Sequence, residues 1–171
     1  MPKLFLEPFR PLAAYTDAMS AAIRPYNTRD FTGLFRIDQA CYPPGIAYSK
    51  TALRWFLNLP GAKCLVGIIG GKIAGFILAE EHAPLAHIIT IDVVEAERRS
   101  GIGSDLLRAI EADLALQGVR TIVLETAINN EPAIAFWQKH GYRIQSVLKR
   151  YYLGRLDAYE MKKALPAPKE N

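Results

Sequence analysis

The sequence predicts an α/β fold, in which a mixed and mostly antiparallel sheet of six to seven strands carries helices on both faces. Apolar runs of strand length follow one another after residue 60, and Gly70-Gly71 between two of them is typical of a tight hairpin. A helical pattern separates the strand-like runs 86–94 and 120–126, which is typical of a crossover between parallel strands. The predicted element order is βααβββαβαββ.

The first part of the chain is predicted to hold one strand and two helices. Residues 21–27 form a short strand-like run. Residues 28–42 carry apolar side chains at helical spacing, with Thr28 as the expected N-cap. Residues 49–59 predict a second helix that begins with Ser49 as its cap and ends before a Pro-Gly pair.

The second part alternates between strand and helix patterns. The predicted strands are 63–69, 72–80, 86–94, 120–126, 142–153 and 156–165. A helix that begins near Gly103 should end at Gly118, because glycine commonly follows the last helical residue. The next helix, 129–141, has Asn130 as its expected cap and a proline in its first turn.

The composition predicts a single domain over residues 21–165, with an N-terminal arm at 1–20 and a flexible tail at 166–171. The net charge of +4 favours an anionic ligand, but basic residues form no stripe with exposed aromatics, so we expect no nucleic acid partner. Cys41 and Cys64 lack metal-type spacing, which favours free thiols in a reduced, cytoplasmic protein. No apolar run reaches the length of a membrane span, so we expect no membrane partner.

The stretch ERRSGIGSDLLRAI, residues 97–110, joins a strand to a helix through a basic, glycine-containing loop. A helix N-terminus exposes unpaired N–H groups, and Gly101 and Gly103 allow a ligand to approach the backbone. With the charges of Arg98 and Arg99, this arrangement suits a pyrophosphate. Turn-forming glycines and solvated arginines are the alternative interpretation. The G-x-G-x-x-G fingerprint of dinucleotide-binding folds is not matched.

The spacing Arg98-x-x-Gly101-x-Gly103 resembles the acetyl-CoA signature of the GCN5-related N-acetyltransferases (GNATs), written Q/R-x-x-G-x-G/A. The stretch LETAINNEPAIAFWQKHGY resembles the next strand and helix of the same family. Two further stretches, DQACYPPGIAYSKTAL and KRYYLGRLDAYEMKKAL, are similar to RimI-type ribosomal-protein alanine acetyltransferases and related protein N-terminal acetyltransferases. The resemblance runs from about residue 22 to 165. It implies the GNAT fold and acetyl-CoA as cosubstrate, with no metal.

The resemblance also implies roles for single residues in binding acetyl-CoA. The backbone of Ile91, Asp92 and Val93 would line the acetyl group and the pantetheine arm, where the strand opens away from its neighbour. The side chains of Arg98 and Arg99 would offset the phosphate charge. The amides expected to hold the pyrophosphate belong to Arg99, Ser100, Gly101, Ile102, Gly103 and Ser104. Asn130 would contact the pantetheine arm or cap its helix, and Trp137 would line the thioester channel or pack in the core.

Glu125 is the candidate general base. Within the predicted strand it shares a face with Val123, and a carboxylate in an apolar strand needs either a partner or a function. RimI-type enzymes carry their proton acceptor at the matching position, whereas a buried ion pair is the alternative role. Their acid tyrosine, twelve positions further on, is replaced by Trp137, whose indole is no acid at neutral pH. Either no acid is needed or a late tyrosine supplies it, with Tyr152 favoured over Tyr151.

The acceptor side is predicted around the segment CYPPGIAY, residues 41–48, with Tyr42, Tyr48 and Tyr151 as substrate-binding candidates. The predicted function is direct transfer of acetyl from acetyl-CoA to a primary amine, foremost a protein or peptide N-terminus. A small amine such as a polyamine, amino acid or drug is one alternative acceptor. A non-catalytic acetyl-CoA sensor or regulatory subunit is the other alternative function, and a homodimer is one possible assembly.

Overall fold

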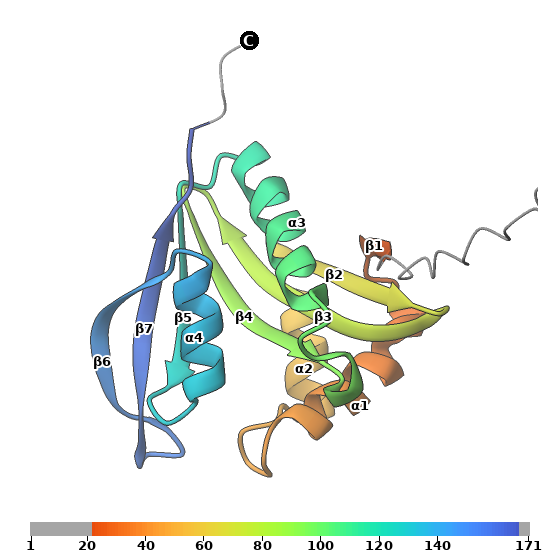
Figure 1. The fold of residues 1–171 in the computed structure, drawn as a ribbon, viewed down its shortest axis with the longest axis horizontal. Helices are drawn as coiled ribbons and strands as arrows, with labels where there is room; N and C mark the ends of the chain where they lie inside the picture. Colours follow the sequence, from red (N-terminus) through yellow and green to blue (C-terminus); the bar gives the residue numbers. More distant parts are fainter. Residues whose placement is uncertain (1–21, 168–171) are drawn as a thin grey trace, which may run out of the picture.

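The computed structural model describes residues 22–167, in which seven strands form one sheet with the order β1-β2-β3-β4-β5-β7-β6 (Figure 1). The strands are β1 (Ala22–Pro25), β2 (Ala62–Ile69), β3 (Lys72–His82), β4 (Leu85–Val93), β5 (Thr121–Ala127), β6 (Arg143–Tyr152) and β7 (Leu156–Ala164). The α-helices are α1 (Phe31–Cys41), α2 (Lys50–Leu57), α3 (Ile102–Leu116) and α4 (Glu131–Lys139), with short 3₁₀ turns at Thr28–Asp30 and Glu95–Glu97. The element order and mixed sheet predicted from the sequence are confirmed. The predicted arm, residue 21 and residues 168–171 lie outside the described part, and the division into arm, domain and tail stays a prediction.

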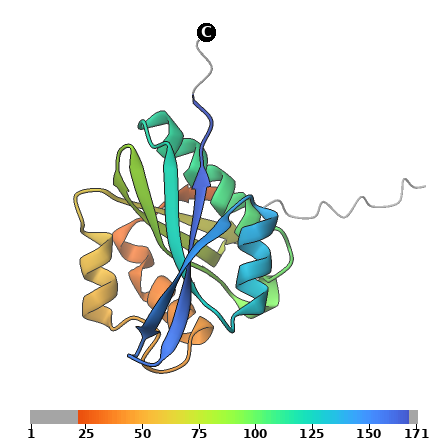
Figure 2. The ribbon, with the colours of Figure 1, turned by 90° about the vertical axis from the view of Figure 1, so that its left-hand side faces the viewer.

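The sheet has two halves, β1 to β4 and β5-β7-β6, which separate along most of their common edge (Figures 1 and 2). Strands β4 and β5 are parallel and pair only over Leu85–His87 with Thr121–Val123. Every other neighbouring pair of strands is antiparallel. The edge of β4 that faces β5 therefore lacks ladder partners beyond His87, and a gap opens between the two strands.

Two clusters of buried side chains cover the two faces of the sheet. The larger cluster joins α3 and Trp137 of α4 to one face of β3, β4, β5 and β7. The smaller cluster packs α1 and α2 against the other face of β2 and β3. Helices on both faces were predicted and are confirmed. Among residues 22–167, no helix combines the length and the hydropathy that crossing a bilayer requires.

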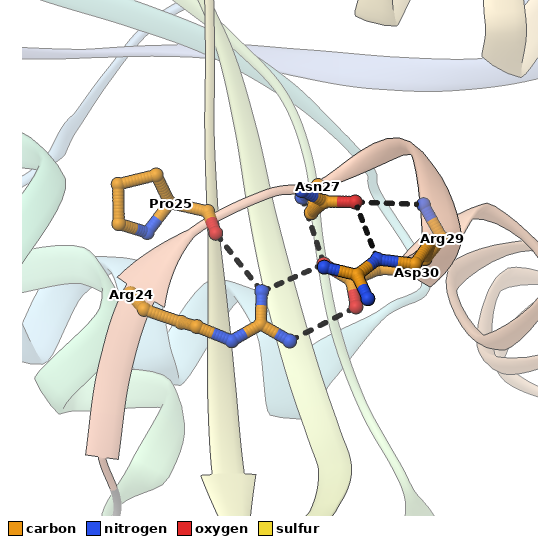
Figure 3. A network of polar contacts seen from close by, with 5 residues as sticks. All are labelled: Arg24, Pro25, Asn27, Arg29 and Asp30. Atoms are coloured by element: carbon orange, nitrogen blue, oxygen red, sulfur yellow. Dashed lines mark hydrogen bonds and ion pairs between the residues drawn. The ribbon is translucent and has the colours of Figure 1, made fainter.

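The junction between β1 and α1 is held by side chains rather than by a simple helix cap (Figure 3). Asn27, and not the predicted Thr28, caps the short 3₁₀ turn that precedes α1 by accepting from the amide of Arg29. The Asp30 carboxylate accepts from the amide of Asn27 and binds both terminal nitrogens of Arg24 at 2.7 and 2.9 Å. This bidentate pair fixes the start of α1.

The other predicted turns and caps match the structure. Gly70 and Gly71 connect β2 and β3 with φ values of 57° and 76°, which side chains rarely adopt. Ser49 accepts from the amide of Ala52 at the start of α2. Asn130 does the same for Ala133 at the start of α4.

An irregularity in β4 determines which of its side chains point to the α1–α2 side of the sheet and which point to the α3 side. The register with β3 shifts so that Ala79 pairs with Ile88 and Leu78 with Thr90, which leaves Ile89 as a β-bulge. Before the bulge, His87 faces the α1–α2 side, and after it Thr90 and Asp92 face that side. An uninterrupted strand would have turned the side chains of residues 90 and 92 to the α3 side.

Candidate active site

The gap between β4 and β5 exposes unpaired main-chain groups. The amide of Val94 donates to Ala74 of β3, and backbone groups alternate in direction along a strand. Ile91 and Val93 therefore turn their N–H groups toward the gap, as predicted for residues that line a bound acetyl group. Asp92, which was predicted with them, turns its backbone toward β3 and its side chain toward α1 and does not face the gap.

The N-terminus of α3 opens beside the end of β4 and has no side-chain cap. Within the described residues, the amides of Gly101, Ile102, Gly103 and Ser104 donate no hydrogen bond. Gly101 has a φ of 98°, and Arg99 has a φ of 67°, which is costly for a residue with a side chain. This loop presents a row of free N–H groups to an anion.

Two residues of the predicted pyrophosphate-binding loop already form hydrogen bonds with other groups of the protein. The amide and the hydroxyl of Ser100 both donate to the carbonyl of Glu97. The guanidinium of Arg98 donates to the carbonyl of Val93 and to the sulfur of Cys41. In this structure Arg98 therefore ties the loop to β4 and α1, while Arg99 remains exposed.

His140 joins this region, although sequence reasoning gave it no role. Its Nε2 lies 2.8 Å from the Oγ of Ser104, in the first turn of α3. Burial lowers the pKa of His140, which favours the neutral ring. The sequence offered no signal for this contact, because it depends on how the first turn of α3 meets the C-terminal end of α4.

Glu125 lies on β5 at the edge of the gap, with its side chain on the α1–α2 side. Its Oε2 is 2.6 Å from Nε2 of His87, and the Glu125 side chain is 17% exposed. The hydrogen bond to Glu125 raises the pKa of His87 and outweighs the opposing effect of burial. Glu125 therefore forms an ion pair with His87, and the alternative role stated for it, a buried ion pair, stays open beside that of general base.

Three tyrosines surround this pair. The hydroxyl of Tyr152 is 3.5 Å from the carbonyl of Glu125, and the ring of Tyr151 packs edge-on against that of Tyr152 with centroids 5.0 Å apart. Burial raises the pKa of Tyr152 to about 12, so the phenol keeps its proton. The hydroxyl of Tyr48 donates to the carbonyl of Ile89 at 3.4 Å. The predicted residues Glu125, Tyr152, Tyr151 and Tyr48 are thus brought together, although their roles stay predictions.

The Tyr151-Tyr152 pair owes its position to an irregularity near the end of β6. The register between β6 and β7 shifts between Leu148 and Tyr152, where Arg150 has a φ of 53°. Asp157 of β7 accepts from the amide of Arg150 and from the ammonium group of Lys149. An aspartate at this place in the motif LDAYEM therefore holds the turn that presents the two tyrosines.

The remaining predicted residues have internal partners. Tyr42 directs its hydroxyl to the Oγ1 of Thr90 at 3.2 Å, and Asn130 caps α4. Trp137 is 5% exposed and packs against the ring of Tyr142, so the structure gives it the core role. Contacts of these residues with acetyl-CoA or an acceptor stay predictions.

A hollow of about 340 Å³ adjoins the His87–Glu125 pair. Its lining residues are Glu80, His82, Leu85, Ala86, His87, Val123 and Glu125. Glu80 is bonded to Nε2 of His82 at 2.7 Å. In the described part of the chain, no group of three or more His, Cys, Asp or Glu side chains could hold a metal ion.

Comparisons with known proteins agree with this geometry. Residues 31–142 match the acetyltransferase (GNAT) family. The N-alpha-acetyltransferase MAK3 of Arabidopsis thaliana is 30% identical over 138 residues, which cover 78% of this chain and 70% of that protein. The ribosomal-protein-S18-alanine N-acetyltransferase of Escherichia coli superposes with a TM-score of 0.77 at 23% identity, covering 88% of this chain and 99% of that one. The structure of Arabidopsis thaliana NAA60 in complex with acetyl-CoA superposes with a TM-score of 0.75 at 21% identity, covering 85% of this chain and 99% of that one.

The family match and the N-alpha-acetyltransferase relative identify an enzyme that transfers an acyl group, and the splayed strand pair beside an uncapped helix N-terminus is consistent with it. The chain belongs to the acetyltransferase (GNAT) family. The resemblance predicted from Arg98-x-x-Gly101-x-Gly103 is confirmed at the level of the family.

Proposed function

We propose that this protein transfers the acetyl group of acetyl-CoA directly to the α-amine of a protein or peptide N-terminus. The observation that carries the proposal is the Glu125–His87 pair at the edge of the β4–β5 gap, walled by Tyr48, Tyr151 and Tyr152. The uncapped start of α3 lies next to the same gap. The relative MAK3, an N-alpha-acetyltransferase, supports the choice of acceptor.

Each part of the site has a task in this reaction. The free amides at the start of α3 bind the diphosphate of acetyl-CoA. The N–H of Val93 polarises the thioester carbonyl and stabilises the oxyanion that forms when the amine attacks. A C–N bond forms, the C–S bond breaks, and the thiolate leaves with the electron pair. Tyr152 is the proposed proton donor to that thiolate.

The Glu125–His87 pair removes the proton that the nitrogen must lose. An α-amine has a pKa of about 8, so roughly a tenth of it is neutral near pH 7. A base at the site therefore helps deprotonate the amine as well as the tetrahedral adduct, directly or through one water molecule. The short contact lets the carboxylate and the imidazole take up the proton as one unit.

A screen of peptides with different N-terminal residues, incubated with acetyl-CoA and read by mass spectrometry, tests the proposal. The expected product carries one acetyl group on the α-amine, and peptides blocked at the N-terminus should stay unmodified even when they contain lysine. Thiol release without any acetylated acceptor would contradict the proposal and support the sensor alternative.

A small amine remains the second candidate acceptor, because the hollow beside Glu125 also contains the carboxylate of Glu80. Two carboxylates suit an acceptor with a second positive charge. Polyamines and free amino acids belong in the same screen. If they were acetylated in preference to every peptide, a small amine would become the first candidate acceptor and a peptide N-terminus the second. A cytoplasmic location and a homodimer stay predictions.

A further inference from the structure

The start of α3 makes a side-chain contact that the binding of acetyl-CoA by main-chain amides does not use. Ser104 lies in the first turn, and its Oγ is 2.8 Å from Nε2 of His140, the residue that ends α4. Phe136, one turn earlier in α4, packs against the His140 ring with centroids 4.7 Å apart. A side chain on Gly103 would meet the Phe136 ring at 3.5 Å. Two successive side chains of α4 therefore contact the turn whose amides are free.

The Ser104 hydroxyl lies beside an amide that the proposed function assigns to the diphosphate. Within residues 22–167, the amide of Ser104 donates no hydrogen bond. Only Cα and Cβ separate the nitrogen of a serine from its Oγ, and side chains of a helix lean toward its N-terminus. A phosphate oxygen that accepts from the Ser104 amide is therefore within reach of the Ser104 hydroxyl.

The hydrogen bond between Ser104 and His140 has two possible directions, and only one of them leaves a proton for the diphosphate. The hydroxyl has a single hydrogen. If it donates to Nε2, a phosphate oxygen meets only the lone pairs of Oγ, which repel it. If Nε2 donates to Oγ, the hydroxyl hydrogen is free to bind the phosphate. Nδ1 of His140 has no hydrogen-bond partner in the described part of the chain, so no contact there holds the hydrogen on Nδ1.

The charges around His140 keep the ring neutral and suit an anion beside it. Burial lowers the pKa of His140, Glu111 opposes this effect, and three cations add to the lowering, namely Lys163, Lys139 and Arg108. Glu111 is itself paired with Lys163 at 2.6 Å. A neutral ring carries one hydrogen, so its place on Nε2 or Nδ1 decides what Ser104 can donate to.

We propose that His140 is a positioning residue for acetyl-CoA, whose Nε2–H donates to Ser104 Oγ and so directs the Ser104 hydroxyl at the diphosphate. His140 itself contacts neither the diphosphate nor the reacting atoms. The proposal rests on the function proposed above, which places the diphosphate at the start of α3. It predicts that His140 acts on the binding of CoA through Ser104, and only when the ligand carries the diphosphate.

Calorimetric titration of the whole chain with CoA tests this coupling. His140→Phe keeps a ring against Phe136 and removes both nitrogens, and Ser104→Ala removes the hydroxyl. Each substitution should weaken CoA binding about tenfold, because each loses a hydrogen bond to a charged group. The double variant should bind no more weakly than either single one. A double variant that is weaker by about a hundredfold, or a His140→Phe protein that binds CoA like the wild type, overturns the proposal.

A rescue variant and a matched control accompany this titration. His140→Gln keeps a side-chain N–H for Oγ and should bind CoA within about threefold of the wild type. His82→Phe removes a histidine that is also bonded to a single side chain, that of Glu80, but lies outside the loop. It should bind CoA like the wild type. Equal losses in His82→Phe and His140→Phe would refute a role that is specific to His140.

A truncated donor separates this role from a purely structural one. S-acetylpantetheine has the thioester of acetyl-CoA but lacks the diphosphate and the nucleotide. His140→Phe should raise the KM for acetyl-CoA about tenfold and leave the KM for S-acetylpantetheine unchanged. Equal rises for both donors would show that His140 supports the shape of the site and not the diphosphate.

Nitrogen-15 NMR of the histidine rings provides a readout that needs neither variants nor activity. The chain has three histidines, and the His140 ring is identified by its contact with Phe136. With CoA bound at about pH 8, where imidazole is neutral, its hydrogen should reside on Nε2. A hydrogen on Nδ1 refutes the proposal even if the variants fold poorly. If CoA binds but no peptide is acetylated, the proposed acceptor fails, while the titration and the spectrum still decide the role of His140.

Discussion

Strands β4 and β5 face each other across the gap, and each carries one carboxylate on the α1–α2 side in an opposite environment. Asp92 of β4 is fully enclosed, and within residues 22–167 no cation forms a hydrogen bond with it. Glu125 of β5 is partly exposed and is paired with His87. The enclosed acid is suited to retaining a proton, whereas the paired one can exchange protons with a substrate. Burial and partner, rather than residue type, make the two carboxylates different, and on this difference rests the proposed role of Glu125 as a base.

The largest effect is expected from Glu125→Gln, which removes the base and leaves the shape unchanged. The kcat should fall by about 10² to 10⁴, since general bases contribute on that scale. Steady-state kinetics measure it, with circular dichroism to check the fold. Glu160→Gln is the control, because Glu160 pairs with Glu125 across β5 and β7 on the same face. An equal loss in both variants would assign the effect to charge on the sheet face and not to a base.

Asp92→Asn should act on stability in the opposite direction to an ordinary surface aspartate. The pKa of Asp92 rises from 3.8 to about 7 on folding, so the native state binds more protons than the unfolded state between those values. Stability due to this group is therefore full below about pH 4 and lost as pH rises to about 7. Asparagine should raise the free energy of unfolding by up to about 4 kcal/mol at about pH 8.5, and by nothing near pH 4.

Urea unfolding at several pH values measures this difference. Asp157→Asn provides the contrast, because the hydrogen bond from Lys149 lowers the pKa of that half-buried carboxyl. A lowered pKa means that stability is present above the unfolded value and lost in acid, so this substitution should lower stability at neutral pH. If both substitutions changed the free energy of unfolding with pH in the same direction, the proposed difference between the enclosed Asp92 and the paired Asp157 would be wrong.

Gly101→Ala tests whether the anion site beside β4 is independent of both carboxylates. A side chain at a φ of 98° strains the loop that presents the free amides. The acetyl-CoA KM should rise about tenfold, with kcat and acceptor KM less affected. Gly118→Ala, at the other end of α3 with a φ of 92°, should cost similar stability and leave the KM unchanged.

The smallest expected effect concerns His87→Gln, which leaves Glu125 with a neutral partner. Because Glu125 raises the pKa of His87, the protonated pair cannot accept a proton, and activity should fall on the acid side in the wild type. In the variant the acid limb of kcat/KM should move to lower pH, with a loss of only a few-fold at the optimum. An unchanged acid limb would show that His87 does not titrate with the base.

The sequence was sufficient to predict the element order, because its turns and caps are local. Gly70-Gly71, Ser49 and Asn130 each act within a few residues of their position. The choice of Asn27 over Thr28 as a cap was missed, since both residues cap well and the decision depends on Asp30 binding Arg24. Glu125 could be singled out as a candidate base because strand alternation and an unusual carboxylate are both visible in the sequence, and that role stays a prediction.

The parts of the site that were not predicted depend on distant contacts. His87 and Glu125 are 38 positions apart, and only the strand register brings them together. In the pattern AHIITIDVV the polar residues His87, Thr90 and Asp92 do not keep a strict alternation, and the sequence alone does not show that a bulge at Ile89 is the reason. Without that bulge, Asp92 could not be distinguished from a residue facing the other layer. Arg98 similarly bonds to Cys41 and Val93 while it stays exposed, and no local pattern indicates these two partners.

The extra residue at Ile89 has a consequence for how this strand can change over evolution. If one residue were lost or gained there, each later side chain of β4 would move from one face of the sheet to the other. The side chain of Asp92 would then point into the hydrophobic core beneath α3, and that of Ile91 would take its place beside α1. We expect relatives to vary freely in the side chains along this segment while keeping its length.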